Sequence, residues 1–409
     1  MRFLFLHPNF PSQHGPFASY LGRQPGNEVV FMTNVERGEL PGVRRIVYQL
    51  GREPKKETHH YLRGMELSVL HGQAAFRTAI ALRNTGWIPD VIFGHSGWGS
   101  TLYMKDVFPG RPLLCNFEWF YHAHGSDSDF DPSEPLTADD EVRIRTKNPA
   151  ILMDLVACES GVVPMQWQKK QFPPEFNGKL GVLHEGIDTD YHQPDPEAKL
   201  VLPRVNLDLS QAKEIVTYVS RGFEPYRGFP QVVEALARIL ERRPEAHIVL
   251  VGEDRAAYGR KAPDGKTWKQ VALEKTPLDP ARAHFTGPLT TAEYRKVLQS
   301  SSAHIYLTRP FVLSWSCMEA MSAGCALVTS RTAPVEEVVE HGVNGLMVDF
   351  FQPQQTADAV CAILENPGQF TSMRAKARET IVSRYAIRDL WPRRQAWMRH
   401  HATAPVISR

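Results

Sequence analysis

The chain has 409 residues, of which 42% are hydrophobic and 22% are charged. A chain of this length is too long for one compact core, so two domains of roughly 200 residues are expected. Its 47 basic and 45 acidic side chains give a net charge of +2, which argues against a protein with a dominant nucleic-acid-binding surface. An anionic ligand would therefore have to be bound by local charges.

The cysteines and the apolar runs favour a protein of the reducing cytoplasm. The five cysteines are scattered without C-x-x-C spacing, and most lie in apolar runs, where cysteine is usually a small buried hydrophobic residue. The apolar run before His7 is too short for a signal peptide, and no run reaches the roughly 18 apolar residues of a membrane span. We expect a soluble cytoplasmic protein that at most rests on the inner membrane surface.

Short apolar, β-branched runs alternate with longer segments of helical periodicity, which indicates parallel sheets covered on both faces. The first series of predicted strands covers residues 3–7, 29–33, 91–95, 113–117, 155–159 and 180–186. The second series covers residues 215–220, 247–252, 283–287, 303–308, 325–330 and 345–349. The sequence therefore predicts an α/β protein with two doubly wound, Rossmann-like domains that face each other across a cleft.

The segment between the two series is rich in proline and polar residues and lacks a clear hydrophobic period, so we interpret it as the interdomain connection. The predicted boundaries are an amino-terminal domain of residues 1–190, a linker of residues 191–213 and a carboxyl-terminal domain of residues 214–385. Parallel α/β sheets bind ligands beyond the carboxyl ends of their strands. The loops at those ends are therefore the candidate sites.

Two arginines follow the first strand of the second series. Arg221 lies at the strand end, and Arg227 with Gly228 opens the next helix. A helix N-terminus exposes unpaired N–H groups, and guanidinium groups add planar, permanently charged donors, so the combination suits a diphosphate. The alternative is that both arginines are solvated loop charges, but their place at a strand's carboxyl end favours phosphate binding.

The stretch RPFVLSWSCMEAMSAGC, residues 309–325, follows another strand of the second series. Ser316 and Glu319 have the spacing of a helix capping box, and Gly324 is placed to end that helix. This reading uses only two of the polar side chains in the stretch.

A ligand-binding reading accounts for more of the same loop. The backbone N–H groups of residues 311–316 would point into the cleft, and Glu319 could accept hydrogen bonds from the two hydroxyls of a ribose. Ser314, Trp315 and Ser316 would then form a cradle for sugar and phosphate.

Taken in order, Arg221, Arg227-Gly228 and the stretches LVGED, HFTGPL, FVLSWSCMEAMSAGCALVTS and VEEVVEHGVNGLMV closely resemble the retaining glycosyltransferases of family 4, which have the GT-B fold. The likeness covers the whole second domain and is weaker in the first, where HPNFPSQHGPF, FGHSGWG and LHEGIDTDYHQPD carry it. The resemblance implies a hexosyltransferase that takes a nucleoside diphosphate sugar as donor and needs no cofactor and no metal ion. It also implies a final helix, within residues 386–409, that crosses back to the first domain.

The resemblance further implies roles for the donor-side residues. Arg221 and Arg227 would hold the diphosphate, with Arg227 standing where the family more often has lysine, and Glu319 would bind the ribose. The remaining implied donor contacts are the base-binding backbone at Pro288 and Leu289, the loop residues Val312, Leu313, Ser314, Trp315 and Ser316, and Glu337 in the region of the family's G-G-x-x-E motif.

One departure from the family pattern concerns the donor sugar. Family members commonly carry two glutamates eight positions apart, whereas the position eight residues before Glu319 is Phe311, or Arg309 if the loop is two residues longer. Recognition of the sugar would then depend on the backbone amides of residues 312–316 and on the two serine hydroxyls of that loop. The sugar itself is not identified by the sequence.

Acceptor-side candidates follow strands of the first domain. His95 lies at a strand end among glycines and is the candidate for contact with the transferred sugar or acceptor, so we rank it with the two arginines as catalytic. The other acceptor-side candidates are His14, Gly15, Trp98, Glu118 and Trp119. A structural role is the alternative for the histidines, and core packing is an equal alternative for Trp119. By the resemblance, the acceptor hydroxyl would attack from the face of the leaving group, so no protein base is required.

Three alternatives stay open. Asp127, Asp129, His122 and His124 could hold a metal ion, although a solvated acceptor loop is the favoured reading. The protein could be another GT-B enzyme, such as a nucleotide-sugar epimerase or a glycosyl phosphorylase, or a sugar-nucleotide-binding module without catalysis. Weak peripheral contact with a membrane is conceivable through the stretch MQWQKKQFPPEF and the basic residues near position 145.

Overall fold

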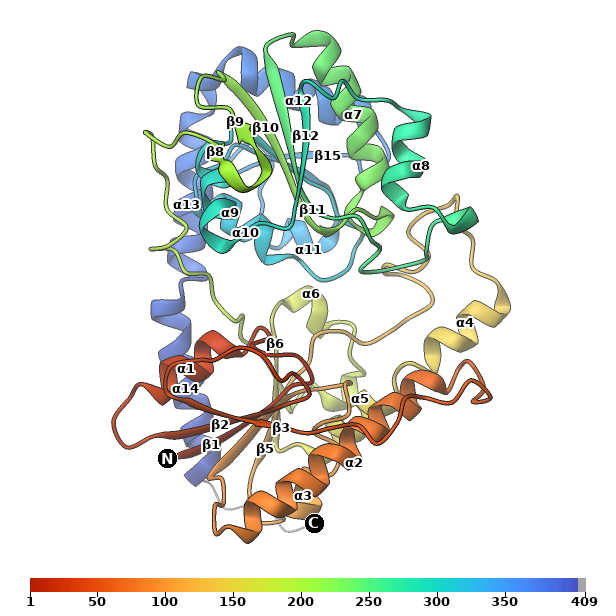
Figure 1. The fold of residues 1–409 in the computed structure, drawn as a ribbon, viewed down its shortest axis with the longest axis vertical. Coiled ribbons are helices and arrows are strands. Elements are labelled where there is room, and N and C mark those ends of the chain that lie inside the picture. The colour runs from red at the N-terminus through yellow and green to blue at the C-terminus, as the bar shows by residue number, and fades with distance from the viewer. Residues whose placement is uncertain (404–409) are drawn as a thin grey trace. The chain divides into compact units, whose positions relative to one another are not determined.

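A computed structural model describes residues 1–403 and divides the chain into two compact units. The first unit contains residues 1–185 together with residues from 388 onward, and the second contains residues 186–387. Each unit has one parallel sheet with helices packed against it (Figure 1). The predicted fold class, two Rossmann-like α/β domains, is confirmed.

The first unit is built on a seven-stranded parallel sheet. Its strands are β1 (Arg2–Leu6), β2 (Glu28–Thr33), β3 (Val43–Val47), β4 (Val91–His95), β5 (Leu113–Asn116), β6 (Ser160–Val163) and β7 (Leu180–Val182). Its helices are α1 (Gly15–Gly22), α2 (Arg63–Asn84), α3 (Met104–Val107), α4 (Ala138–Arg145), α5 (Pro149–Ala157), α6 (Gln166–Lys169) and α14 (Ile387–Thr403). The strand order is β3-β2-β1-β4-β5-β6-β7, so the chain reverses its direction of sheet growth between β1 and β4.

The second unit is built on a six-stranded parallel sheet. Its strands are β10 (Glu214–Gly222), β11 (Ala246–Glu253), β12 (Ala283–Gly287), β13 (Ala303–Tyr306), β14 (Leu327–Ser330) and β15 (Leu346–Val348). Its helices are α7 (Phe229–Arg242), α8 (Trp268–Lys275), α9 (Thr291–Gln299), α10 (Trp315–Ser322), α11 (Ala333–Glu336), α12 (Pro353–Glu365) and α13 (Thr371–Arg384). The order β12-β11-β10-β13-β14-β15 places the switch point between β10 and β13, where open sheets of this kind bind ligands.

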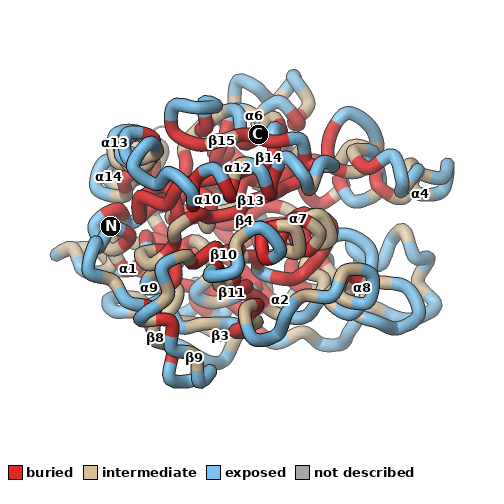
Figure 2. The backbone as a smooth tube through the Cα atoms, turned by 90° about the horizontal axis from the view of Figure 1, so that it is seen from above, coloured by how far each residue is buried: buried red, intermediate tan, exposed pale blue. Residues whose placement is uncertain are grey.

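Burial explains why these segments form strands and helices. The buried stretches of the backbone follow the central strands of each sheet, as in β4 and β13 (Figure 2). In α7, Val232, Leu236 and Ile239 are buried at a spacing of three and four residues, which is the spacing of one helix face. Within residues 1–403, no helix combines the length and the apolar sequence needed to cross a bilayer.

Two strand assignments differ from the sequence prediction. Residues 155–159, predicted as a strand, are the end of α5 and the turn after it, and the strand follows as β6. A short apolar run does not distinguish a buried strand from a buried helical turn, and Leu155 is buried on the inner face of α5 together with Ile151. The edge strand β3 was missed because its arginines interrupt the apolar pattern.

The predicted linker contains ordered structure that belongs to the second unit. An antiparallel pair, β8 (Val201–Leu202) and β9 (Leu207–Asp208), lies within it. Leu200, Leu202 and Leu209 are buried against residues of the second sheet, including Ile215 and Val249. The chain between residues 186 and 213 therefore adds to the core of the second unit.

The last helix, α14, packs on the sheet of the first unit. Met398 is fully buried in a cluster with Phe3 and Phe93, and the Arg394 guanidinium donates to the carbonyl oxygen of Leu183 at 3.0 Å. The indole N–H of Trp391 donates to the carbonyl oxygen of Glu185 at 3.0 Å. These contacts join the carboxyl end of the described chain to the end of β7.

Candidate functional site

A pocket of about 470 Å³ lies in the second unit, beyond the carboxyl ends of β10 and β11. Seven of its lining residues were predicted as donor-binding from the sequence: Arg221, Pro288, Leu289, Ser314, Trp315, Ser316 and Glu319. Sequence reasoning missed the other eight: His192, Val219, Ser220, Val251, Gly252, Glu253, Thr291 and Tyr294. The structure thus brings together the strand end at Arg221 and the beginning of α10, which are about ninety residues apart in the chain.

Arg221 and Arg227 occupy different environments. Arg221 is exposed at the end of β10 and lines the pocket, whereas Arg227 is only 8% exposed and is not among the pocket-lining residues. The Nη1 atom of Arg227 donates to Tyr306 Oη at 2.9 Å, to Thr308 Oγ1 at 2.7 Å and to the carbonyl oxygen of Val312 at 3.0 Å. Arg227 therefore holds the loop before α10 through its hydrogen bond to the carbonyl oxygen of Val312.

The same tyrosine hydroxyl ties the arginine to the helix start. Tyr306 Oη accepts from Arg227 and also from the backbone N–H of Ser314, at 2.9 Å in each case. Because one buried hydroxyl oxygen receives both hydrogen bonds, the position of Ser314 depends on the position of Arg227.

Helix α10 begins at the pocket, but its cap is not the predicted one. Ser314, not Ser316, is the N-cap, and its Oγ accepts from the backbone N–H of Ser316 at 3.3 Å. The predicted pairing of Ser316 with Glu319 as a capping box is wrong, because the helix starts at Trp315 and the Glu319 carboxylate bonds elsewhere. The predicted stop at Gly324 is confirmed, with φ of 75° just beyond the helix.

Glu319 is held by two residues that the sequence did not single out. Tyr294 Oη donates to Glu319 Oε2 at 2.7 Å, and His192 Nε2 lies 3.5 Å from Glu319 Oε1. Burial raises the pKa of Glu319, and the hydrogen bond from Tyr294 acts against that rise. Tyr294 lies on α9 and His192 in the predicted linker, so only the tertiary fold reveals the cluster.

Three other donor-side candidates lie outside the lining of this pocket. Val312 and Leu313 belong to the loop before α10, and Leu313 is buried. Glu337 follows α11, where its carbonyl oxygen accepts from Arg384 at 3.3 Å. Phe311 is 8% exposed, and its ring centroid lies 5.6 Å from that of Tyr226 and 5.3 Å from that of Tyr258. Phe311, one of the two residues that could stand at the position of the family's first glutamate, is thus part of an aromatic cluster.

In the first unit, the structure brings together four of the acceptor-side candidates. His95 ends β4 and is 4% exposed; its Nε2 lies 3.0 Å from Glu118 Oε2, and its Nδ1 lies 2.8 Å from the carbonyl oxygen of Ser96. Burial lowers the pKa of His95. The contacts with Glu118 and the Ser96 carbonyl raise it by more than burial lowers it, so the net pKa is above the usual value. The ring centroids of His14 and Trp98 lie 5.8 Å and 6.3 Å from that of His95.

The remaining first-unit candidates make packing contacts within the unit. Trp119 is 5% exposed, and its ring centroid lies 6.4 Å from that of Trp167. A Cβ on Gly15 would lie 2.4 Å from Pro11 Cβ, and a Cβ on Gly99 would lie 1.9 Å from the carbonyl oxygen of Ser68. These glycines allow close packing within the unit. From the sequence, we expected the glycines near His95 to let a ligand approach the backbone.

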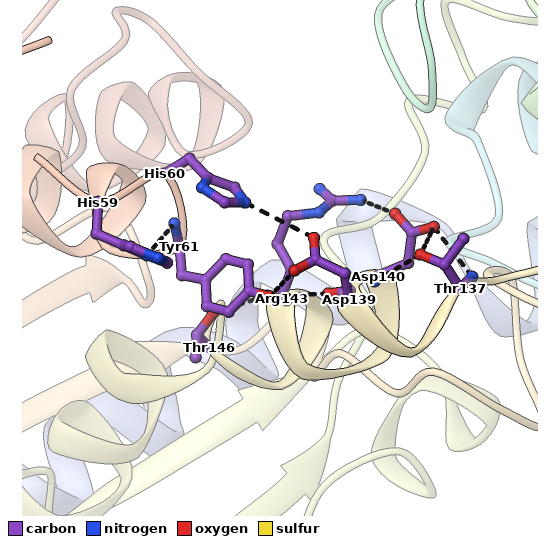
Figure 3. A network of polar contacts seen from close by, with 8 residues as sticks. All are labelled: His59, His60, Tyr61, Thr137, Asp139, Asp140, Arg143 and Thr146. Carbon is purple, nitrogen blue, oxygen red and sulfur yellow. Dashed lines mark hydrogen bonds and ion pairs between the residues drawn. The ribbon is translucent and has the colours of Figure 1, made fainter.

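The acidic and histidine-rich loop before α4 makes local contacts. His124 Nδ1 lies 3.4 Å from Asp129 Oδ2, and its Nε2 lies 3.2 Å from Glu141 Oε1. Figure 3 shows the neighbouring network, in which Asp139 at the start of α4 meets His60 and Tyr61. Within residues 1–403, no group of three or more His, Cys, Asp or Glu side chains is arranged to hold a metal ion.

The turn that carries His95 is anchored by a buried carboxylate. Asp154 on α5 is fully buried, and its Oδ2 accepts from Ser96 Oγ at 2.8 Å and from the backbone N–H of Gly97 at 3.2 Å. Burial raises the pKa of Asp154 to about 6, although the hydrogen bonds oppose this. Sequence reasoning did not identify this residue, because a lone aspartate in a helix carries no pattern.

Asp154 makes the stability of the first unit depend on pH. Since its pKa in the folded state exceeds the usual 3.8, folding favours the protonated form, and this stabilising contribution is lost as pH rises from about 4 through 6. The loss is about 2 to 3 kcal/mol for a shift of roughly two units. Asp154→Asn cannot titrate, so its free energy of unfolding relative to wild type is expected to rise across this window.

Urea unfolding at a series of pH values from 4 to 7 measures this difference. Ser96→Ala removes one of the hydrogen bonds that oppose the rise in the pKa but keeps the carboxylate, so its stability should still fall as pH rises, over a window that extends to higher pH than in wild type. A difference between Asp154→Asn and wild type that stays constant with pH would contradict the assignment.

Comparison with known proteins adds two family matches. Residues 25–192 match the family described as Glycosyl transferase family 4 group, and residues 204–380 match the family described as Glycosyl transferases group 1. The two matches are in chain order, and together they take in most of both units.

Curated relatives share lower identity over part of the chain. A D-inositol 3-phosphate glycosyltransferase of Corynebacterium glutamicum is 24% identical over 190 residues, which are 46% of this chain and 44% of the relative. A GDP-mannose-dependent alpha-(1-6)-phosphatidylinositol monomannoside mannosyltransferase of Mycobacterium tuberculosis is 27% identical over 235 residues, which are 54% of this chain and 56% of the relative. The chain thus spans about half the length of the curated relatives it matches.

Solved structures share the fold over nearly the whole chain. Anabaena Alr3699/HepE in complex with UDP-glucose matches with a TM-score of 0.69 at 15% identity, covering 98% of this chain and 100% of that chain. Sucrose-phosphate synthase from Thermosynechococcus elongatus matches with a TM-score of 0.73 at 15% identity, covering 98% of both chains. At this identity the likeness establishes the fold.

Proposed function

Because the chain belongs to the GT4-type glycosyltransferases and has the GT-B fold, we propose that it is an enzyme that transfers a sugar, most simply a hexose, from a nucleoside diphosphate sugar to an acceptor hydroxyl. We further propose that transfer retains the anomeric configuration and uses no metal ion or other cofactor. Donor binding is assigned to residues 214–385 with the adjoining segment, and acceptor binding to residues 1–190.

One observation carries the proposal: the pocket beyond β10 and β11 combines a cation, a helix N-terminus and a partly buried carboxylate. Arg221 and the N-terminal end of α10 suit the diphosphate. Glu319 suits the ribose hydroxyls, and the backbone at Pro288 and Leu289 lies where a base could bind. The loop residues Val312, Leu313, Ser314, Trp315 and Ser316 are assigned to the donor sugar and phosphate, and Glu337 to the same side.

The chemistry follows from where charge develops. As the bond from the anomeric carbon to the diphosphate oxygen breaks, negative charge grows on the leaving group and positive charge grows on the sugar. Arg221 and the α10 N–H groups stabilise the leaving group, and such contacts are typically worth about 2.7 to 4 kcal/mol each in the transition state. Arg227 holds the loop that presents those N–H groups.

The acceptor hydroxyl attacks the anomeric carbon from the face that the diphosphate leaves, and its proton passes to a phosphate oxygen. No protein side chain then needs to act as the base. His95, oriented by Glu118 and the Ser96 carbonyl, is proposed to contact the transferred sugar or the acceptor, with His14, Gly15, Trp98 and Trp119 on the acceptor side.

The relatives suggest the classes of donor and acceptor to try. The names of two relatives refer to GDP-mannose and to inositol-containing molecules, and the Anabaena structure holds UDP-glucose. We propose a glycan, a lipid-linked molecule or a small molecule as acceptor, with the enzyme in the cytoplasm. Weak contact with the inner membrane surface would suit a lipid-linked acceptor.

Screening of UDP, GDP, ADP and TDP sugars tests the proposal. We expect one group of donors to raise the melting temperature and to be hydrolysed slowly, with release of the nucleoside diphosphate. Activity that survives EDTA and a product anomer that matches the donor by NMR would support the metal-independent, retaining reaction.

A non-catalytic sugar-nucleotide-binding module is the second candidate. The observation that favours it is the aromatic cluster around Phe311, because the family's carboxylate position falls on Phe311 or Arg309 and neither is a carboxylate. Binding of a sugar nucleotide without turnover, with any acceptor class, would support the module and contradict the transferase.

A further inference from the structure

The carboxylate of Glu319 is fixed in the pocket by protein groups before any ligand is considered. Its side chain is 18% exposed, with Tyr294 Oη at 2.7 Å from Oε2 and His192 Nε2 at 3.5 Å from Oε1. The rings of His192 and Tyr294 lie 5.8 Å apart, at 65° to each other. One residue therefore lies beside each oxygen of the carboxylate.

His192 is itself anchored to the helix that carries Glu319. Its carbonyl oxygen accepts from Ser322 Oγ at 2.6 Å, and from Arg378 Nη1 at 3.2 Å. Ser322 is the last residue of α10, one turn beyond Glu319. Glu319 belongs to α10, and His192 is hydrogen-bonded to the end of the same helix. The separation of the two side chains is therefore fixed by one helix.

The charge states of the cluster leave Glu319 as a hydrogen-bond acceptor for a ligand. Burial lowers the pKa of His192 to about 4, Asp188 opposes this and Arg295 adds to it, so the imidazole is neutral at pH 7. Burial raises the pKa of Tyr294 well above its usual value, so its hydroxyl keeps its proton. The other charged groups that line the pocket are Arg221 and Glu253.

A carboxylate offers about four lone-pair sites, and the tyrosine hydroxyl uses one of them. The sites that remain on both oxygens can receive two adjacent hydroxyl groups, provided that the carboxylate plane does not rotate. Rotation would break the 2.7 Å bond from Tyr294 and change the 3.5 Å contact between Oε1 and His192 Nε2.

We propose that Tyr294 and His192 are positioning residues that hold the Glu319 carboxylate for the 2′- and 3′-hydroxyls of a ribose, so that the site selects ribonucleotides over 2′-deoxyribonucleotides. This inference rests on the proposed function, because it takes the pocket as the nucleotide site. It adds to that function a donor class, the sugars of ribonucleoside diphosphates. It also adds two positioning residues, Tyr294 on α9 and His192 in the predicted linker. By this proposal, TDP sugars with a deoxyribose are poor donors.

Calorimetric titration of the full chain with UDP, GDP and ADP and with their 2′-deoxy forms is the test. For the ribonucleotide that binds wild type, we expect the 2′-deoxy form to bind about tenfold or more weakly, as for loss of a hydrogen bond to a charged group. Tyr294→Phe should weaken the ribonucleotide and bring the ratio of the two affinities close to one.

The pH profile separates positioning from a merely structural role. Loss of the tyrosine hydrogen bond leaves burial unopposed, so the pKa of Glu319 rises further in Tyr294→Phe. Ribonucleotide affinity, which needs the ionised carboxylate, should then fall away at a higher pH than in wild type. Glu319→Gln should lose both the pH dependence and the ribose preference, and Tyr191→Phe, a control at the residue before His192, should bind as wild type does.

The outcomes distinguish a failure of the proposed function from a failure of this inference alone. If wild type binds none of the nucleoside diphosphates, the proposed function and this inference both fail. If wild type binds one of them, but folded Tyr294→Phe keeps the same affinity, ribose preference and pH profile, the inference alone is overturned. An unfolded Tyr294→Phe is replaced by His192→Ala, for which a reduced ribose preference supports the inference and an unchanged one overturns it.

Discussion

Arg227→Ala is expected to abolish most sugar transfer and to destabilise the second unit at the same time. The substitution removes the donor to Thr308 Oγ1 and to the carbonyl oxygen of Val312, and it leaves a cavity beneath the loop before α10. Leaving buried acceptors without a donor costs about 2 to 4 kcal/mol in total. Because Ser314 is held through the same tyrosine hydroxyl, the N–H groups that suit the diphosphate lose their alignment.

The expected fall in kcat/KM is about 100- to 1,000-fold, the size seen when one preorganised donor is lost from a comparable site. Steady-state rates and urea unfolding on the same samples measure both effects. Arg227→Lys, which keeps the charge on a shorter donor, should show intermediate losses in both. Full activity in a destabilised Arg227→Ala would contradict the bracing role.

Arg221→Ala is expected to give the second large effect, with a different signature. Arg221 is exposed and lines the pocket, so its removal should change the free energy of unfolding by no more than about 0.5 kcal/mol. If its guanidinium stabilises charge that grows on the leaving diphosphate, kcat and kcat/KM should fall together by about 100-fold or more.

Arg242→Ala is a suitable control, because Arg242 is an exposed arginine of the same unit that pairs with Asp358 on α12. A rise in KM with an unchanged kcat in Arg221→Ala would show that Arg221 binds the ground state and the transition state equally. That result would contradict its assignment as a catalytic residue.

The general position of the site could be predicted from the sequence. Apolar runs placed the central strands, and the rule for parallel sheets pointed to the loops after them, which is why Arg221, Ser314 and Glu319 were found. These predictions depend on local pattern and on one topological rule. Both are properties that a single sequence carries.

The details that failed depend on contacts between distant segments. Burial of Arg227 under the loop follows from Tyr306 at the end of β13, the strand next to β10, and from Thr308 just after it, and no local pattern indicates it. Tyr294 and His192 are ordinary residues in the sequence, and only the packing of α9 and the segment after β7 brings them to Glu319. The apolar run at residues 155–159 fits a strand or a helix equally well, and in the structure its first residues continue helix α5.

The membership of residues 186–213 in the second unit has a practical consequence for exchanging halves between enzymes of this type. A chimera joined at residue 213 would separate Leu200 and Leu202 from their core and would replace His192 with whatever the other parent supplies. Joints before Gly186 and after Ile387 would transfer all the residues that line the pocket, and with them the proposed donor preference.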